Sequence, residues 1–144
     1  MEKNVNEMSV REYDEHCEKV MAQFLDEHFY KKIGYTWRER VTDRERQVKG
    51  LDVILKRDGK VYNIDEKAAI RYTNGLNTFA LELSFLNRKG NRVDGWLIDE
   101  KKINDYYVFV WINKIDGELI ENKVSFKDVD VALVSKEKII LHLE

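Results

Sequence analysis

The first element that the pattern of apolar and polar residues predicts is a long amphipathic helix near the start of the chain. Ser9, with Glu12 three residues later, matches a capping box, in which each side chain satisfies a backbone N–H group at the helix start. Apolar residues then recur at intervals of three and four, which is the spacing of one helix face. They are Tyr13, Cys17, Val20, Met21, Phe24 and Leu25. We expect this helix to end at about Tyr30.

After this helix the pattern changes to the alternation and the apolar runs that are typical of β-strands. Residues 78–86 alternate between apolar and polar types, and residues 106–112 form a nearly continuous apolar run, as expected of a strand buried on both faces. Ser135 is placed to cap a final helix. The expected strands are Tyr35–Val41, Leu51–Leu55, Val61–Ala69, Thr78–Leu86, Tyr106–Ile112 and Val129–Val134, with a turn-rich basic segment at Asn87–Gly95 and a short helical turn at Asp99–Asn104.

A helix, a series of strands and a last helix, in that order, predict an α+β fold. The chain has 144 residues, which is the size of one domain, and it contains no proline and no low-complexity linker that would mark a boundary. We therefore expect a single domain over residues 1–144, with a flexible segment at 1–8. The N-terminal helix should pack on a central mixed sheet, and the further helix should lie at the C-terminus.

Composition is typical of a soluble globular protein, with 43% hydrophobic and 36% charged residues. No apolar run approaches the length of a membrane span, and residues 1–8 lack the apolar stretch of a signal peptide. The single cysteine, Cys17, excludes an internal disulfide and any zinc site built from cysteines. We therefore predict a cytoplasmic protein that does not act at a membrane.

Candidate chemistry lies in the two strands on either side of Asp58-Gly59, because this residue pair is typical of a tight hairpin turn. Asp65 and Lys67 leave the same face of their strand, and the folded-back hairpin can bring Asp52 beside them. Two carboxylates can bind Mg²⁺, for which Mn²⁺ can substitute, and an adjacent ammonium group can orient water. This trio predicts phosphodiester hydrolysis, with Asp52 and Asp65 as metal ligands. The alternative is a set of ordinary solvent-facing strand residues.

The stretch GLDVILKRDGKVYNIDEKAA resembles the core motif of the PD-(D/E)XK nuclease superfamily, which has the restriction-endonuclease-like fold. In that family an aspartate begins one strand, and an acid-x-lysine triplet lies in the next. The resemblance implies that Asp52 is the first acid, Asp65 the second acid and Lys67 the lysine. It also implies a restriction-endonuclease-like core and a Mg²⁺-dependent endonuclease with DNA as its partner.

Two positions depart from the family pattern. Leu51 stands where the motif usually has proline, and Glu66 stands where an apolar residue is commoner. Glu66 either binds a neighbouring cation or marks a shifted register, and a shift would put Lys67 on the opposite face from the acidic ligand. Family members also often carry an acidic residue in the helix before the sheet, which here implies Glu18 or Asp14, with Glu18 preferred.

Two further candidate contacts lie on either side of the motif. Gln47 is a candidate for contact with a phosphate or a metal-bound water, and the alternative is an ordinary polar loop residue. Glu82 lies on the polar face of the strand expected at residues 78–86. It becomes an additional metal or water contact if that strand neighbours the one that carries Asp65.

The segment before the motif is basic. Residues 31–50 carry seven lysines and arginines against three acidic residues, whereas the whole chain has a formal net charge of −2. Affinity for a nucleic-acid backbone comes largely from such charges, through the release of counterions. The alternative is a solvated surface loop. The predicted nucleic-acid-binding residues are Arg38, Arg40, Arg44, Arg46 and Lys49.

Three functions are compatible with the sequence. The first is a metal-dependent DNA nuclease, either a homodimer that cuts both strands or a subunit of a larger nucleic-acid-processing assembly. The second is a catalytically inactive nuclease-fold protein that serves as a DNA-binding or assembly subunit. The third is a small α+β interaction protein in which the triplet arose by chance. The intact acidic and lysine positions favour the first over the second.

Overall fold

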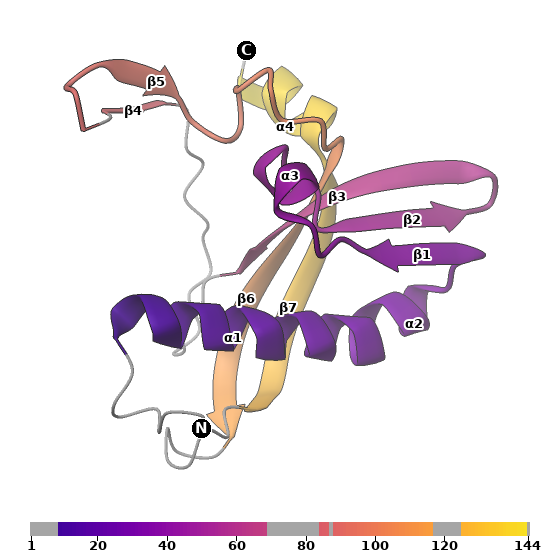
Figure 1. The fold of residues 1–144 in the computed structure, drawn as a ribbon. Helices are drawn as coiled ribbons and strands as arrows, with labels where there is room; N and C mark the ends of the chain where they lie inside the picture. Colours follow the sequence, from indigo (N-terminus) through magenta and orange to yellow (C-terminus); the bar gives the residue numbers. More distant parts are fainter. Residues whose placement is uncertain (1–8, 69–83, 87, 117–124, 144) are drawn as a thin grey trace. The chain divides into compact units, whose positions relative to one another are not determined.

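The computed structural model of the chain describes residues 9–68, 84–86, 88–116 and 125–143 (Figure 1). The fold is α+β, with a five-stranded mixed sheet and helices at both ends, as the order of elements predicts. The predicted flexible segment at residues 1–8 lies outside the described residues. The elements are α1 (Val10–Phe24), η2 (Leu25–Tyr30), α2 (Lys31–Ile33), β1 (Trp37–Arg40), α3 (Arg44–Val48), β2 (Val53–Arg57), β3 (Lys60–Ala68), β4 (Ser84–Leu86), β5 (Arg92–Asp94), β6 (Tyr106–Asp116), β7 (Ser125–Ser135) and α4 (Lys136–Leu143).

The chain forms two compact units, each made of segments that are distant in sequence. The first unit is drawn from the described residues of Met1–Gly34, Ala68–Asn77 and Val110–Val131, and the second from those of Tyr35–Lys67, Thr78–Phe109 and Ala132–Glu144. Strands β6 and β7 contribute to both units. None of the helices in the described part of the chain has the length and apolar character needed to cross a membrane.

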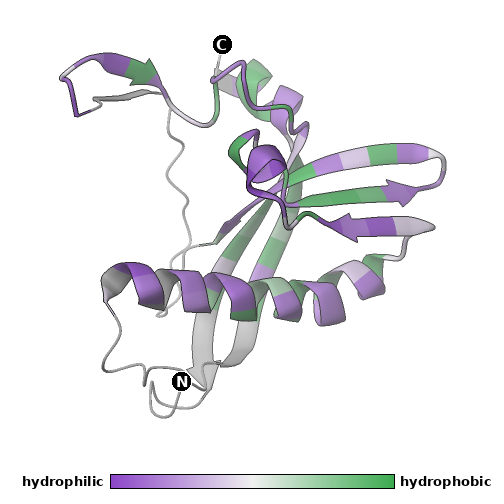
Figure 2. Ribbon diagram, viewed as in Figure 1, coloured by the Kyte–Doolittle hydropathy of each residue, from purple (hydrophilic) through white to green (hydrophobic). Residues whose placement is uncertain are grey.

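The N-terminal helix begins as the capping box predicts. The Glu12 N–H donates to the Ser9 hydroxyl oxygen at 3.2 Å, and that hydroxyl donates to the Glu12 carboxylate at 3.3 Å. The alternation of apolar and polar residues along α1 (Figure 2) gives it a buried stripe that includes Cys17, Met21 and Leu25. The helix runs on through the π-helical segment η2 and ends at Ile33, three residues beyond the predicted Tyr30.

The predicted hairpin is confirmed as strands β2 and β3, which pair antiparallel. Its turn is Asp58-Gly59, with positive φ angles of 50° and 75°, as a two-residue type I′ hairpin turn requires. Val53 lies opposite Ile64, and both are fully buried. Because side chains alternate, the buried residues Val53, Leu55 and Ile64 lie on one face of the hairpin, whereas Ile54, Val61, Asn63 and Asp65 lie on the other.

The sheet has the strand order β1-β2-β3-β6-β7. Strands β6 and β7 lie side by side and run in opposite directions (Figure 1). The apolar run in β6 is buried along consecutive residues from Tyr107 to Val110, which confirms the prediction of burial on both faces. Strand β7 is longer than the predicted Val129–Val134. The Lys138 N–H donates to the Ser135 hydroxyl at 3.4 Å at the start of α4, as predicted.

One predicted segment differs from the structure, and two others are matched in part. The basic segment expected to be a turn contains strand β5, which pairs antiparallel with β4, because the chain reverses at Gly90, where φ is 81°. Of the strand expected at residues 78–86, only 84–86 are described, as β4. The helical turn expected at Asp99–Asn104 is one hydrogen-bonded turn, in which Lys102 N–H donates to the Asp99 carbonyl at 3.0 Å, followed by extended chain.

Helix α3 is an element that the periodicity did not predict, because it is only five residues long. Its N-cap is Asp43, whose carboxylate accepts from the Arg46 N–H at 3.1 Å. At its end the Gly50 N–H donates to the Gln47 carbonyl and the Leu51 N–H donates to the Arg46 carbonyl. These are the two bonds of a Schellman motif, which needs a left-handed residue at Gly50, where φ is 83°. The motif turns the chain directly into β2.

We expect Gly50→Ala to lower the free energy of unfolding by about 2–3 kcal/mol. Alanine would be held at a φ of 83°, and its Cβ would lie 2.9 Å from Oδ1 of the buried Asn104. Gly59→Ala is the matched control, because Gly59 has a φ of 75° but no heavy atom within 4 Å of an added Cβ. It should cost about 1 kcal/mol in urea denaturation. An equal loss in both variants would show that the contact with Asn104 adds nothing.

Candidate active site

The β2–β3 pairing brings Asp52 and Asp65 together. The β2–β3 register ends at Val53 opposite Ile64, and the N–H of Asp52, the residue directly before β2, donates to the Ile64 carbonyl at 2.8 Å, which holds Asp52 next to Asp65. The two carboxyl groups lie within hydrogen-bonding reach of each other. The sequence pattern therefore predicted this proximity, while the catalytic role of the pair stays a prediction.

Two further groups hold the pair. The Glu66 N–H donates to Asp52 Oδ2 at 2.7 Å, which fixes the Asp52 carboxyl against the backbone of β3. The Lys67 Nζ lies 3.4 Å from Asp65 Oδ2. Asp65 is 6% exposed and Lys67 is only partly exposed, so this ion pair is shielded from solvent on most sides. The three residues predicted as catalytic thus form one cluster on one face of the sheet.

Burial dominates the electrostatics of the two carboxyl groups. It raises the pKa of Asp52 to about 7, the Asp65 carboxylate adds to that rise, and the hydrogen bond from the Glu66 backbone opposes it. Burial also raises the pKa of Asp65, and the Lys67 ammonium is the main opposing group. Two such groups titrate as a pair, because the first negative charge disfavours the second. The pair therefore tends to retain a proton near neutral pH, and a bound cation would take its place.

Three more side chains that sequence reasoning missed surround Asp65 and Lys67. The Lys67 ammonium lies 4.8 Å from the centre of the Trp96 ring. Lys102 and Lys136 lie close enough to Asp65 for their charges to interact with it. Burial lowers the pKa of Lys136, and the Asp65 carboxylate opposes this shift. No short-range signal could have identified these residues, because turns and the N-terminus of α4 bring them to β3 only in the folded chain.

Glu66 occupies the opposite face of the sheet from Asp65. It accepts two hydrogen bonds from the Arg40 guanidinium, at 2.5 and 3.0 Å, and its side chain is 12% exposed. Of the two alternatives that the sequence left open, Glu66 therefore binds a neighbouring cation, and the register is not shifted. The pairing also explains why an acidic residue is tolerated at a position where apolar residues are commoner. A bidentate arginine satisfies a largely buried carboxylate.

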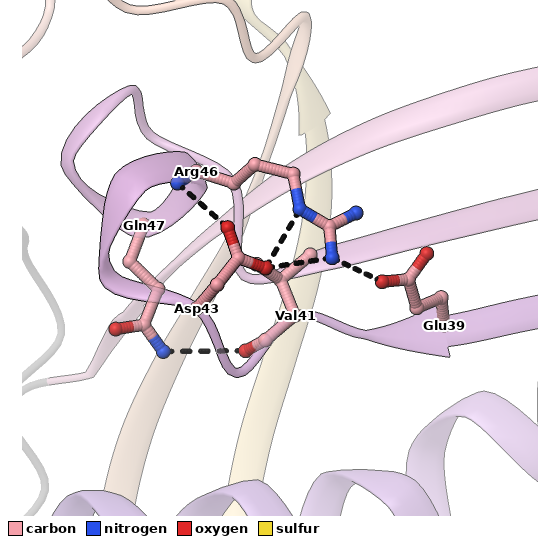
Figure 3. Close-up of polar contacts among 5 residues, drawn as sticks. All are labelled: Glu39, Val41, Asp43, Arg46 and Gln47. Atoms are coloured by element: carbon pink, nitrogen blue, oxygen red, sulfur yellow. Dashed lines mark hydrogen bonds and ion pairs between the residues drawn. The ribbon is translucent and has the colours of Figure 1, made fainter.

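Arg46 and Gln47 contact other residues of the basic segment (Figure 3). The Arg46 guanidinium lies 2.5 Å from the Glu39 carboxylate and 2.7 Å from the Asp43 carboxylate. The Gln47 amide donates to the Val41 carbonyl at 3.2 Å, so it anchors α3 to the end of β1. Arg46 and Gln47, both predicted as ligand contacts, thus hold the loop that leads into β2.

The other predicted nucleic-acid-binding residues fall into two groups. Arg38 and Arg40 lie opposite Leu55 and Val53 in the sheet register, so they leave the face that is opposite to Asp52 and Asp65. Arg38 lies over the Tyr35 ring at 5.5 Å. Arg44 and Lys49 are exposed at the two ends of α3.

The remaining predicted site residues are acidic. Glu18 is an exposed residue of α1, which belongs to the first compact unit, whereas Asp52 and Asp65 belong to the second. Glu82 lies outside the described residues, and so does the side chain of Asp14. Their participation in the site stays a prediction.

The donor set fits a magnesium ion. Within the described residues no group of three or more histidine, cysteine, aspartate and glutamate side chains is positioned to hold a metal. Mg²⁺ keeps several of its waters and commonly takes only one or two protein carboxylates, together with phosphate oxygens from a substrate. The Asp52–Asp65 pair supplies two such carboxylates, and a divalent cation held by them would offset their negative charges.

Comparisons with protein-family models, with curated proteins and with solved structures find no match to this chain. The resemblance to the PD-(D/E)XK superfamily therefore rests on the motif at residues 50–69. That motif, together with the cluster of Asp52, Asp65 and Lys67, is the basis for a functional proposal.

We expect Asp52→Asn to stabilise the metal-free protein by about 2–4 kcal/mol at about pH 8 and by less than half of that at about pH 5. The folded-state pKa of Asp52 is raised from 3.8 to about 7. The stability that its proton contributes is therefore fully present below about pH 4 and lost as the pH rises through about 7. Asparagine never ionises and can keep the hydrogen bonds to Glu66 and Asp65.

The measurement is thermal unfolding in EDTA over this pH range. Asp58→Asn is the control, because Asp58 is an exposed carboxylate in the turn of the same hairpin, at a positive φ that asparagine tolerates. A gain from Asp52→Asn that is the same at both pH values would contradict the raised pKa.

Proposed function

We propose that the chain is a metal-dependent nuclease that hydrolyses phosphodiester bonds of DNA, with a core of the restriction-endonuclease-like type. The single observation that supports this most strongly is the buried Asp52–Asp65 pair with Lys67 beside it, on strands in the order that the motif requires. Two carboxyl groups whose pKa values are raised by burial, next to an ammonium group, are the kind of perturbed cluster that is common at catalytic sites.

Asp52 and Asp65 are the residues that would hold the ion. When bound, Mg²⁺ supplies Lewis-acid stabilisation of the phosphate and lowers the pKa of a bound water. Without the ion, the Glu66 N–H already holds the Asp52 carboxyl group, and Lys67 holds that of Asp65. Because both carboxyl groups are already fixed, little conformational entropy is lost when the cation replaces the retained proton.

Lys67 is the group that would act on the reacting atoms. Its ammonium lies beside Asp65 and can donate hydrogen bonds to the attacking water and to a phosphate oxygen. Donors that are already positioned where negative charge develops stabilise the transition state more than the ground state. Lys102 and Lys136 add positive charge near Asp65, which suits the approach of a phosphate backbone.

The DNA backbone would also need contacts away from the reacting phosphate. Arg44 and Lys49 are exposed at the ends of the helix that leads into β2 and Asp52. Arg40 and Arg46 are paired with carboxylates, so they contribute more to the structure of the segment than to its free charge. We therefore assign the phosphate contacts of this segment to Arg44 and Lys49. A catalytically inactive DNA-binding or assembly subunit is the alternative function.

Lys67→Ala and Asp52→Asn should each lower the rate of DNA cleavage by at least about 100-fold. Lys67→Ala removes the positioned ammonium, and Asp52→Asn removes a charged metal ligand. The assay incubates plasmid, linear and branched DNA with Mg²⁺ or Mn²⁺, and with EDTA as the metal-free arm.

Lys56→Ala and Asp58→Asn are the matched controls, because they make the same chemical changes at exposed positions of the same hairpin. They should cleave at the wild-type rate. Cleavage by Lys67→Ala at the wild-type rate would overturn the proposed mechanism. A wild-type protein that binds DNA but never cleaves it would support the inactive-subunit alternative.

Replacing Arg44 and Lys49 together by glutamine should weaken DNA binding and reduce the slope of log affinity against log salt by about two. Each side chain neutralises one phosphate in the proposed interface, so each releases about one counterion. Fluorescence anisotropy of a labelled duplex over a range of salt concentrations measures the slope, with EDTA present to prevent cleavage. The double variant Arg44→Lys, Lys49→Arg keeps both charges and should keep the slope. An unchanged slope in the glutamine variant would place the phosphate contacts elsewhere.

A further inference from the structure

Lys67 is held between a carboxylate and an aromatic ring. Its ammonium lies 3.4 Å from Asp65 Oδ2 and 4.8 Å from the centre of the Trp96 ring. A free lysine side chain samples many rotamers, and fixing it costs conformational entropy. We propose that Trp96 is a positioning residue that holds the Lys67 ammonium in the site. Its catalytic consequence rests on the nuclease function proposed above.

The indole ring of Trp96 is itself fixed by the buried strand β6. The Tyr107 ring packs edge-on against it, with ring centres 5.0 Å apart, and Phe109 lies 6.4 Å away. The Tyr107 hydroxyl donates to the Trp96 carbonyl at 3.3 Å. Tyr107 and Phe109 are buried and stacked on each other at 5.5 Å. Two rings in the core therefore set the orientation of the surface that Lys67 meets.

A tryptophan face suits this task better than a second carboxylate would. It attracts the ammonium through its negative π surface, and tryptophan is the strongest of the aromatic residues in this respect. Unlike a carboxylate, the ring accepts no strong hydrogen bond from the ammonium, so the N–H donors of Lys67 remain available for water and phosphate. It also balances the attraction of Asp65, which alone would draw the ammonium into a closed ion pair. The result is a lysine that is ordered and still able to donate.

The chain contains a second contact of the same kind, which serves as an internal control. Lys56 lies over the Trp37 ring at 5.4 Å, but this pair is on β2 and β1, and Trp37 is 45% exposed. The Lys56–Trp37 pair takes no part in the contacts that define the cluster of Asp52, Asp65 and Lys67. Removing either indole ring removes one cation–π contact, but Trp96→Leu also removes the ring that packs on Tyr107 and Phe109, so Trp96→Phe, which keeps an aromatic ring there, is compared with it.

The first test compares Trp96→Leu, Trp96→Phe and Trp37→Leu in DNA cleavage with saturating Mg²⁺. We expect Trp96→Leu to lower kcat by about tenfold, with KM almost unchanged, because the ammonium is misplaced while the phosphate contacts persist. Trp96→Phe keeps an aromatic face and should lose only about threefold. Trp37→Leu should leave kcat unchanged. Thermal unfolding of each variant establishes that it is folded at the assay temperature.

The second test does not depend on cleavage. Protons on the Lys67 side chain that lie over an indole face resonate upfield of those of other lysines in the NMR spectrum. We expect this upfield signal in the wild type, its loss in Trp96→Leu and its partial retention in Trp96→Phe. Lys67→Gln identifies the signal by removing it, and Trp37→Leu should leave it in place.

The two tests separate the possible failures. A wild type without the upfield signal would overturn the contact between Trp96 and Lys67. Loss of the signal in Trp96→Leu with an unchanged kcat would overturn the positioning role. A wild type that shows the signal but cleaves no DNA would refute the nuclease function. In that case the contact between Trp96 and Lys67 is judged separately: loss of the signal in Trp96→Leu supports the contact, and persistence of the signal overturns it.

Discussion

Where the β2–β3 register ends, Asp52, directly before β2, lies against Asp65 of β3, and the other features of the candidate site follow from this contact. The two carboxyl groups lie within hydrogen-bonding reach, so each lies in the field of the other. The Glu66 N–H is then in place to bind Asp52, and Lys67, two residues beyond Asp65, reaches the same face. A slip of one residue would send the two acids to opposite faces.

The opposite face of the hairpin is what maintains this register. Val53, Leu55 and Ile64 are buried there, and a slip would expose all of them to solvent. On that same face the bidentate contact between Arg40 and Glu66 spans from β1 to β3, across β2. The apolar face thus stabilises an arrangement that the polar face, with two crowded carboxyl groups, would not maintain by itself.

The polar face has an electrostatic cost that the fold tolerates. Burial raises the pKa values of Asp52 and Asp65, and the Asp65 carboxylate raises that of Asp52 further, so the metal-free site is less stable as both groups ionise. Nearby positive charge, from Lys67 above all, offsets part of this cost. Carboxyl groups with such perturbed pKa values are common where a protein binds or transforms a ligand. A ligand that relieves the repulsion gains binding free energy that a site without repulsion would not offer.

Local patterns in the sequence determined the hairpin, its Asp58-Gly59 turn and the shared face of Asp65 and Lys67, because alternation and turn chemistry act over a few residues. They also determined the capped helix at Ser9 and the buried run in β6. Only the tertiary structure decided that Glu66 meets Arg40 and that Trp96 lies beside Lys67. Such contacts join separate strands and turns, and their partners are chosen by packing and charge in three dimensions, which no short-range pattern encodes.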